Sequence, residues 1–199
     1  MNENYKKVID RIKTAADNGN ADSQYILAVM FDEVVEYRNK EEAFKYYTLA
    51  ANNGVPEAQY KLGDIYYYNK DLIFVDKNLL LAFKYYKYAA DNGYAPAQYK
   101  IGEIYEDGLR KYDPKTGKTI VVVAENNGAA FKYYKLAADN GISKAQIRVM
   151  EMCLNKANSK DFEKYYTLAS NSEDEAIRFC AYDLSIRRKT FTKKKTLKK

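Results

Sequence analysis

A segment of about twelve residues recurs along this chain and limits its possible folds more than any other feature. The sequence AFKYYKLAADNG at residues 130–141 returns almost unchanged at residues 82–93 and 43–54. The Asn-Gly glycines fall at positions 19, 54, 93 and 141, so the intervals between copies are 35, 39 and 48 residues. Self-similarity at a period of about 20 to 50 residues is typical of repeat proteins, in which each unit buries its apolar face only against its neighbours.

Each copy predicts a pair of helices. Apolar and aromatic residues in the recurring segment have the i, i+3, i+7 spacing of an amphipathic helix, and Asn-Gly ends it because glycine tolerates the left-handed conformation. A second apolar stripe starts about four residues later, for example at residues 97–105. Gly63 and Gly102 occupy one register inside these second helices, where each costs about 1 kcal/mol relative to alanine. We therefore expect a packed neighbour there that leaves no room for a side chain.

The pattern A-x-x-Y-Y-x-x-A-A-x-N-G-x-x-x-A-Q-x-x-[LI]-G-x-[IV]-Y resembles the Sel1-like repeat, a relative of the tetratricopeptide repeat, over the chain to about Ser185. The family's usual Trp is replaced by the first Tyr of each pair, and its Gly-x-Gly-Val segment is echoed only by Val35, Val75 and Gly108. The resemblance implies an all-α fold, a right-handed α/α solenoid of about five helix-turn-helix repeats over residues 1–186. It also implies a non-catalytic scaffold or adaptor that binds another protein.

The longest interval contains an insertion, residues 109–123, that predicts a β-hairpin. Asp113 with Gly117 four residues later is a turn signal between two β-prone runs. The second run would expose an edge strand able to pair with a strand of a partner. Its candidate contact residues are Ile120, Val121 and Val122.

Lysines repeat on the first helices in a way that packing does not require. They occupy one register, or lie one turn further along: Lys45, Lys84, Lys87, Lys132, Lys135 and Lys164. The resemblance implies that the first helices line the concave surface, where these lysines would form a ladder suited to an acidic partner segment. A merely solvated face is the alternative interpretation. Attraction by such a ladder should weaken with salt.

Basic residues are concentrated at the C-terminus. Residues 187–199 contain eight Lys or Arg and no acid. The positive charge of this segment therefore exceeds the net charge of the whole chain, which is +6. We expect this tail to be disordered. It would either be a solubilising extension or bind nucleic acid or an anionic membrane surface. The candidate residues for such binding are Arg187, Arg188, Lys189, Lys193, Lys194 and Lys195.

Nothing in the sequence predicts catalysis, a cofactor or a metal site. The chain has no histidine, which removes His-dependent triads and the commonest metal ligand. Its two cysteines, Cys153 and Cys180, are too far apart in sequence to suggest zinc, and we interpret them as buried, reduced thiols. Residues 116–119 (TGKT) resemble the end of a P-loop, but Tyr112 stands where the motif needs glycine and no helix is expected to follow.

The remaining features fit an intracellular helical protein. No stretch approaches about 18 apolar residues, so we expect no transmembrane segment and a cytoplasmic location, with the nucleus as the alternative if the tail is a localisation signal. The 21 tyrosines fall mostly on the packing stripes, which favours a structural core over base stacking or carbohydrate binding. In the loop at residues 70–76, Phe74 and Val75 are expected to pack between repeats, with an exposed contact patch as the alternative.

Overall fold

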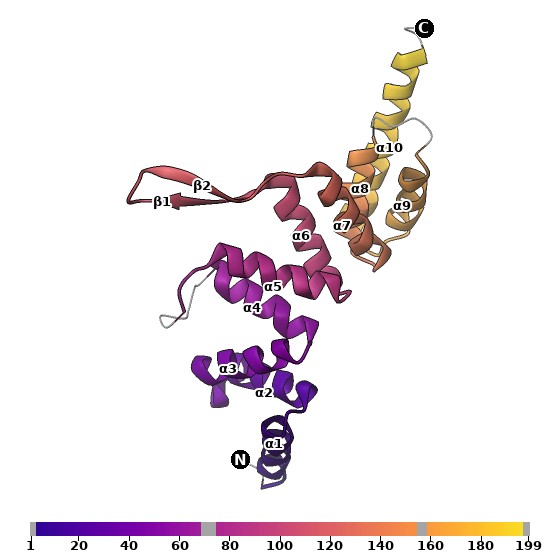
Figure 1. Cartoon of the computed structure of the whole chain (residues 1–199). Helices are drawn as coiled ribbons and strands as arrows, with labels where there is room; N and C mark the ends of the chain where they lie inside the picture. Colours follow the sequence, from indigo (N-terminus) through magenta and orange to yellow (C-terminus); the bar gives the residue numbers. More distant parts are fainter. Residues whose placement is uncertain (1–2, 69–74, 155–158, 197–199) are drawn as a thin grey trace. The chain divides into compact units, whose positions relative to one another are not determined.

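The computed structural model describes residues 3–68, 75–154 and 159–196 (Figure 1). Within these residues the chain forms ten α-helices in five consecutive pairs, one short 3-10 helix and one two-stranded sheet. The expected all-α repeat fold with a β-hairpin insertion is therefore confirmed. The pairs are α1 (Glu3–Asp17) and α2 (Ala21–Glu33), α3 (Lys40–Asn52) and α4 (Pro56–Tyr68), α5 (Leu79–Asp91) and α6 (Ala95–Asp107), α7 (Asn127–Asp139) and α8 (Ser143–Cys153), and α9 (Lys160–Ser170) and α10 (Glu175–Thr196).

The other elements are connections. The 3-10 helix η1 (Val35–Tyr37) joins α2 to α3, and the strands β1 (Leu109–Asp113) and β2 (Lys118–Val123) follow α6. The described residues form two compact units: unit 1 takes those in 1–97 and 111–118, and unit 2 those in 98–110 and 119–196. In unit 1, successive helices pack on one another from α1 to α5. In unit 2, α7 packs on α8, α8 on α9, and α10 on both α8 and α9.

Asparagines begin the first helices of the middle repeats. The side chains of Asn39, Asn78 and Asn126 accept hydrogen bonds from backbone N–H groups in the first turns of α3, α5 and α7. The backbone N–H of each asparagine also donates to a carbonyl near the end of the preceding second helix, at 2.7–2.9 Å. One residue thus caps one helix and fixes its position against the helix before it.

The recurring glycines end these helices as expected. Gly19, Gly54, Gly93 and Gly141 all have φ between +88° and +90°, a conformation that residues with a Cβ rarely adopt. The backbone N–H of each donates to a carbonyl three residues earlier, at 3.0–3.2 Å. The four turns therefore share one geometry, which explains why the Asn-Gly signal repeats so regularly.

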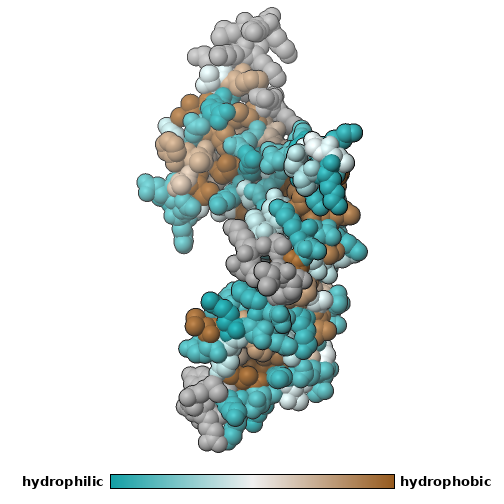
Figure 2. All heavy atoms as spheres, turned by 90° about the vertical axis from the view of Figure 1, so that its left-hand side faces the viewer, coloured by the Kyte–Doolittle hydropathy of each residue, from teal (hydrophilic) through white to brown (hydrophobic). Residues whose placement is uncertain are grey.

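Tyrosine fills the core, as the sequence predicts. Tyr46, Tyr47, Tyr86, Tyr134 and Tyr165 are fully buried. The paired alanines of α3, α5 and α7 are buried too, and their small side chains allow the close approach of neighbouring helices. On the face shown in Figure 2, hydrophobic residues reach the surface in places between hydrophilic ones.

The expectation of a disordered tail from residue 187 is wrong for its first part. Helix α10 continues without a break to Thr196. Ile177, Ala181, Leu184 and Arg188 are buried at successive turns and form one stripe along the helix. Within unit 2 the stripe packs on α8 and α9, so packing holds the helix in place past residue 187, where the basic residues begin.

Two smaller expectations are corrected or only partly tested. Both cysteines are free, but only Cys153 is buried; Cys180 is exposed because it lies on the side of α10 away from its packing stripe. Val75 is buried in unit 1, whereas Phe74 lies outside the described residues. None of the described helices combines the length and hydrophobicity that a bilayer span requires.

Candidate protein-interaction surface

The second tyrosine of a first helix packs against a glycine in the second helix of the preceding repeat. Tyr86 lies on Gly63 in unit 1, and Tyr134 lies on Gly102 in unit 2. A Cβ added at Gly63 would lie 2.5 Å from the tyrosine ring, and one added at Gly102 would lie 2.6 Å from it. The expectation that these glycines face a packed neighbour is confirmed.

The hydroxyl of each of these tyrosines reaches an acid on the same second helix. Tyr86 donates to Asp64 at 2.7 Å, and Tyr134 donates to Glu106 at 2.6 Å. Burial, together with the nearby carboxylate, raises the pKa of both tyrosines well above its usual range. Both phenols therefore stay protonated and act as permanent donors that hold adjacent repeats together.

A glutamine–asparagine contact joins the same repeats at their turns. The Gln59 side chain donates to the Ala51 carbonyl at 3.1 Å and accepts from the Asn92 amide at 3.0 Å. Gln24 makes the corresponding pair of contacts in the first repeat, and Gln98 accepts from Asn140 in unit 2. The buried glutamine thus connects the end of one first helix to the end of the next.

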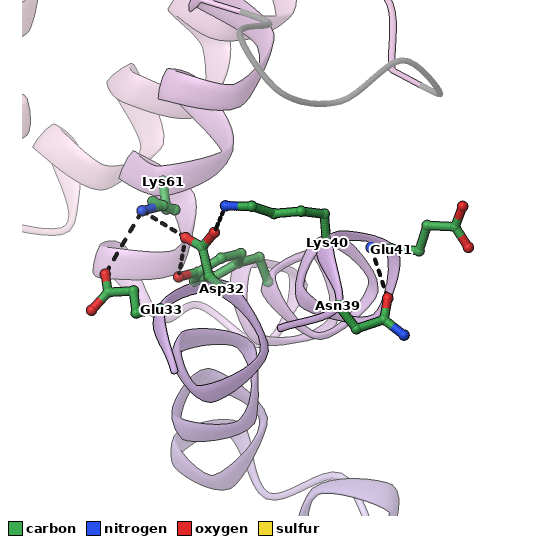
Figure 3. Close-up of polar contacts among 7 residues, drawn as sticks. Asp32, Glu33, Asn39, Lys40, Glu41 and Lys61 are labelled. Atoms are coloured by element: carbon green, nitrogen blue, oxygen red, sulfur yellow. Dashed lines mark hydrogen bonds and ion pairs between the residues drawn. The ribbon is translucent and has the colours of Figure 1, made fainter. Parts of the chain in front are cut away.

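An ion cluster around Asp32 joins three elements of unit 1 (Figure 3). Lys40 reaches Asp32 from α3, and Lys61 reaches it from α4 at 2.8 Å. The Tyr47 hydroxyl donates to the same carboxylate at 3.3 Å. Burial acts to raise the pKa of Asp32, but the hydrogen bonds from the two lysines outweigh it and the pKa is lowered. The cluster joins α2, α3 and α4 and stabilises their packing.

The first tyrosine of each Tyr-Tyr pair can also bind an acid. Its acceptor is the aspartate that ends the first helix of the preceding repeat. The Tyr46 hydroxyl donates to Asp17 at 3.0 Å. In unit 2, Tyr165 and Lys164 both donate to Asp139. Burial and the bond to Asp17 raise the pKa of Tyr46 to about 12. Burial opposes ionisation of Asp139, but its two donors dominate and lower its pKa.

Four of the six ladder lysines form ion pairs with acids of this chain. Lys45 pairs with Glu42 at 3.2 Å, Lys87 with Asp91 at 2.7 Å, Lys135 with Asp161 at 2.7 Å, and Lys164 with Asp139. Exposed pairs of this kind contribute little stability, but they offset the positive charge that a partner would meet.

The other two, Lys84 and Lys132, make no ion pair within the described residues. Each lies over a tyrosine ring instead, Lys84 over Tyr88 at 5.7 Å and Lys132 over Tyr133 at 5.9 Å. A cation held over an aromatic face keeps its charge available to a carboxylate that approaches from the other side.

The hairpin leaves adjacent aliphatic side chains exposed. Ile120 is 50% exposed and Val121 is 56% exposed, whereas Val122 is half-buried. The turn forms as the sequence predicts, because Asp113 accepts from Lys115 N–H and Thr116 Oγ1. These bonds lower the pKa of Asp113. The TGKT segment is thus part of a hairpin turn and the start of β2.

The predicted basic tail divides into two parts. Arg188 is buried: it pairs with Glu163 at 2.8 Å, and its guanidinium lies 4.1 Å from the centre of the Phe162 ring. Arg187 and Lys189 are exposed. The candidates Lys193, Lys194 and Lys195 lie in the last turns of α10. At least one of the predicted tail cations therefore has a structural role.

A cavity of about 460 Å³ opens in unit 1 between the end of α3 and the exposed face of α5. Asn52, Lys84, Tyr85 and Tyr88 are among the residues that line it. No group of three or more acidic or cysteine side chains suited to hold a metal occurs among the described residues. The sequence alone does not reveal this cavity, because it forms where residues from two repeats meet.

The comparison with known proteins bears on this arrangement of repeats. The family model described as Sel1 repeat matches residues 21–55, 56–94 and 95–142, together more than half of the chain. The chain belongs to the Sel1 repeat family. Each family repeat begins at a second helix of the pairs described above and ends after the next first helix. Proteins of this family are generally protein-interaction scaffolds and are typically non-catalytic.

Solved structures agree on the fold. A Sel1 repeat protein from Oxalobacter formigenes is 30% identical, with a TM-score of 0.61 over 73% of this chain and 98% of that one. The c5321 protective antigen of uropathogenic Escherichia coli, which displays an SLR fold, is 20% identical, with a TM-score of 0.65 over 86% of this chain and 34% of that one. Among curated proteins, none matches the sequence significantly.

Proposed function

We propose that this protein is a non-catalytic scaffold that binds another protein through its β-hairpin. The observation that carries the proposal is the exposure of Ile120 and Val121 on β2. A two-stranded sheet is marginally stable by itself and leaves N–H and C=O groups unpaired along its edges. A partner segment in extended conformation would pair with such an edge and cover the aliphatic side chains.

The family supports the same function. Sel1 repeats generally mediate protein interactions, and a chain without histidine lacks the commonest general base and metal ligand. Tyr86 and Tyr134 bind acids of the preceding repeat, and Lys135 pairs with an acid of the next one, so these side chains hold repeats together rather than meet a substrate. A cytoplasmic location is part of this proposal.

The test is affinity capture from lysate of the organism that encodes the protein. Wild type is compared with the double variant Ile120→Lys/Val121→Lys, which removes the exposed apolar surface of β2. Val35→Lys is the matched control, because Val35 in η1 is also an exposed aliphatic residue. We expect wild type and the control to recover the same protein in the same proportion. The double variant should not recover it.

Two results would contradict the proposal. Recovery of the same protein by all three forms would remove the hairpin from the binding site. Recovery only of nucleic acid or of assorted acidic proteins, released by moderate salt, would instead indicate a general electrostatic attraction. Circular dichroism of each variant separates loss of binding from loss of folding.

A further inference from the structure

The position that ends a first helix is an aspartate in three repeats but an asparagine in α3. The last residue of α1, α5 and α7 is aspartate: Asp17, Asp91 and Asp139. The last residue of α3 in the same register is Asn52. In two of the aspartate cases, Asp17 and Asp139, the carboxylate accepts a hydrogen bond from the first tyrosine of the next repeat.

Unit 2 shows what this register binds when the acid is present. Asp139 receives both the Lys164 ammonium and the Tyr165 hydroxyl. The residues of α5 that correspond to these two donors are Lys84 and Tyr85. Because α3 supplies Asn52 in place of aspartate, the two donors of α5 have no carboxylate from the preceding first helix.

The donors of α5 are therefore left without an acceptor. Within the part of the chain that the structure describes, the Tyr85 hydroxyl donates no hydrogen bond and Lys84 pairs with no acid. Both line the 460 Å³ cavity together with Asn52. The Asn52 amide also has no partner within the described residues.

The other walls of the cavity suit a peptide. Leu81 and the Tyr88 ring supply apolar surface. The register of Tyr88 holds leucine in the other first helices that keep the pattern, so this ring is an addition at this repeat. Asp91 also lines the cavity, but its charge is offset by Lys87 at 2.7 Å. The Asn92 amide is already used by Gln59.

We propose that this cavity binds the carboxylate of an aspartate or glutamate side chain from an extended segment of a partner protein. The ligand carboxylate takes the place that Asp139 occupies in unit 2, and it accepts hydrogen bonds from Lys84 and Tyr85. A neighbouring apolar residue of the segment packs on Leu81 and the Tyr88 ring. The proposal rests on the scaffold function and adds a second contact, for an acidic side chain, to the one at the hairpin.

The test is a titration of the full chain with a blocked peptide, acetyl-Ala-Leu-Glu-Leu-Ala-amide. Binding is monitored by nuclear magnetic resonance of the protein's backbone amides. We expect saturable shifts at residue 52 and along residues 81–92. Lys84→Ala should weaken binding by about tenfold or more, because a hydrogen bond to a charged group is lost. Asn52→Asp should abolish it, because the nearly isosteric aspartate supplies the missing carboxylate from within. Lys45→Ala is the matched control, since Lys45 has the same register but pairs with Glu42.

The possible outcomes each decide the matter. Absence of saturable shifts with wild type, or equal binding by Asn52→Asp, would overturn the proposal. Equal binding of a peptide with glutamine in place of glutamate would show that the carboxylate is not recognised. Binding only of a glutamate-free peptide with an unblocked C-terminus would assign the site to a chain end instead. The affinity capture that tests the hairpin is independent of this titration. If a partner protein is captured through the hairpin but the peptide does not bind, the scaffold function stands and only the proposal for the cavity fails.

Discussion

The contact between Gly63 and Tyr86 allows the packing of repeats to be tested with one methyl group. On helix propensity alone, Gly63→Ala should stabilise α4 by about 1 kcal/mol. The structure predicts the opposite result. The new Cβ would lie 2.5, 2.6 and 2.9 Å from three atoms of the Tyr86 ring, well inside ordinary contact. The ring is fully buried and lies against the rings of Tyr60 and Tyr67, so it cannot move aside without displacing its neighbours.

The expected loss follows from these contacts. Overpacking a well-filled core costs about 1 to 3 kcal/mol. A shifted ring also weakens the hydrogen bond from Tyr86 to Asp64, and a bond to a charged group contributes about 1.5 to 3 kcal/mol. After the gain in propensity is subtracted, we expect the free energy of unfolding to fall by about 1 to 3 kcal/mol.

The assay is urea unfolding followed by circular dichroism, with Gly128→Ala as the control. Gly128 lies in the first turn of α7, and its nearest neighbour would be Asn126 Oδ1 at 3.4 Å, an ordinary contact. That variant should be as stable as wild type or slightly more stable. A Gly63→Ala variant that is equal to or more stable than wild type would refute the reasoning, as would an equal loss when Tyr86 is first replaced by leucine.

Three further predictions follow from single contacts. Asp32→Asn should lower stability at pH 7 by about 1 to 2 kcal/mol, because Lys61 loses a carboxylate partner. Folding lowers the pKa of Asp32, so the stability difference between wild type and this variant should be present above about pH 4 and disappear as the pH falls through the folded pKa. Urea titrations at several pH values measure this difference. Cys180 should react with a thiol reagent in the native protein, whereas Cys153 should react only on unfolding; rapid labelling of a Cys180→Ser variant would contradict the burial of Cys153. Arg188→Lys should lower the free energy of unfolding by about 0.5 to 1.5 kcal/mol, measured with urea. Lysine keeps the positive charge but loses the stacking of the planar guanidinium on the Phe162 ring.

Local signals explain the parts of the fold that the sequence predicts well. The helix pairs follow from apolar spacing, the helix ends from Asn-Gly, and the hairpin from the turn chemistry of Asp113 and Gly117. The glycine at position 63 is predicted to face a close neighbour because it recurs at position 102 in the same register. In each case the information lies within one repeat or in the comparison of copies.

Contacts across repeats explain what the sequence does not predict. Asn92 binds Gln59 from 33 positions away, so neither residue signals the pair. The ladder lysines look unpaired in sequence, yet Lys135 meets Asp161 of the next repeat. Counting basic residues marks the tail as disordered, but it misses that Arg188 continues a buried stripe at helical spacing. Such contacts are visible only when the repeats are stacked.

The central claim, that the hairpin binds a partner protein, is tested most directly by crosslinking in the organism that encodes the chain. A photoreactive amino acid is placed at Val121, and at Val35 as the control, and the crosslinked peptides are identified by mass spectrometry. We predict one partner protein, joined through a single short segment, from position 121 and not from position 35. The same set of products from both positions, or none from position 121, would contradict the claim.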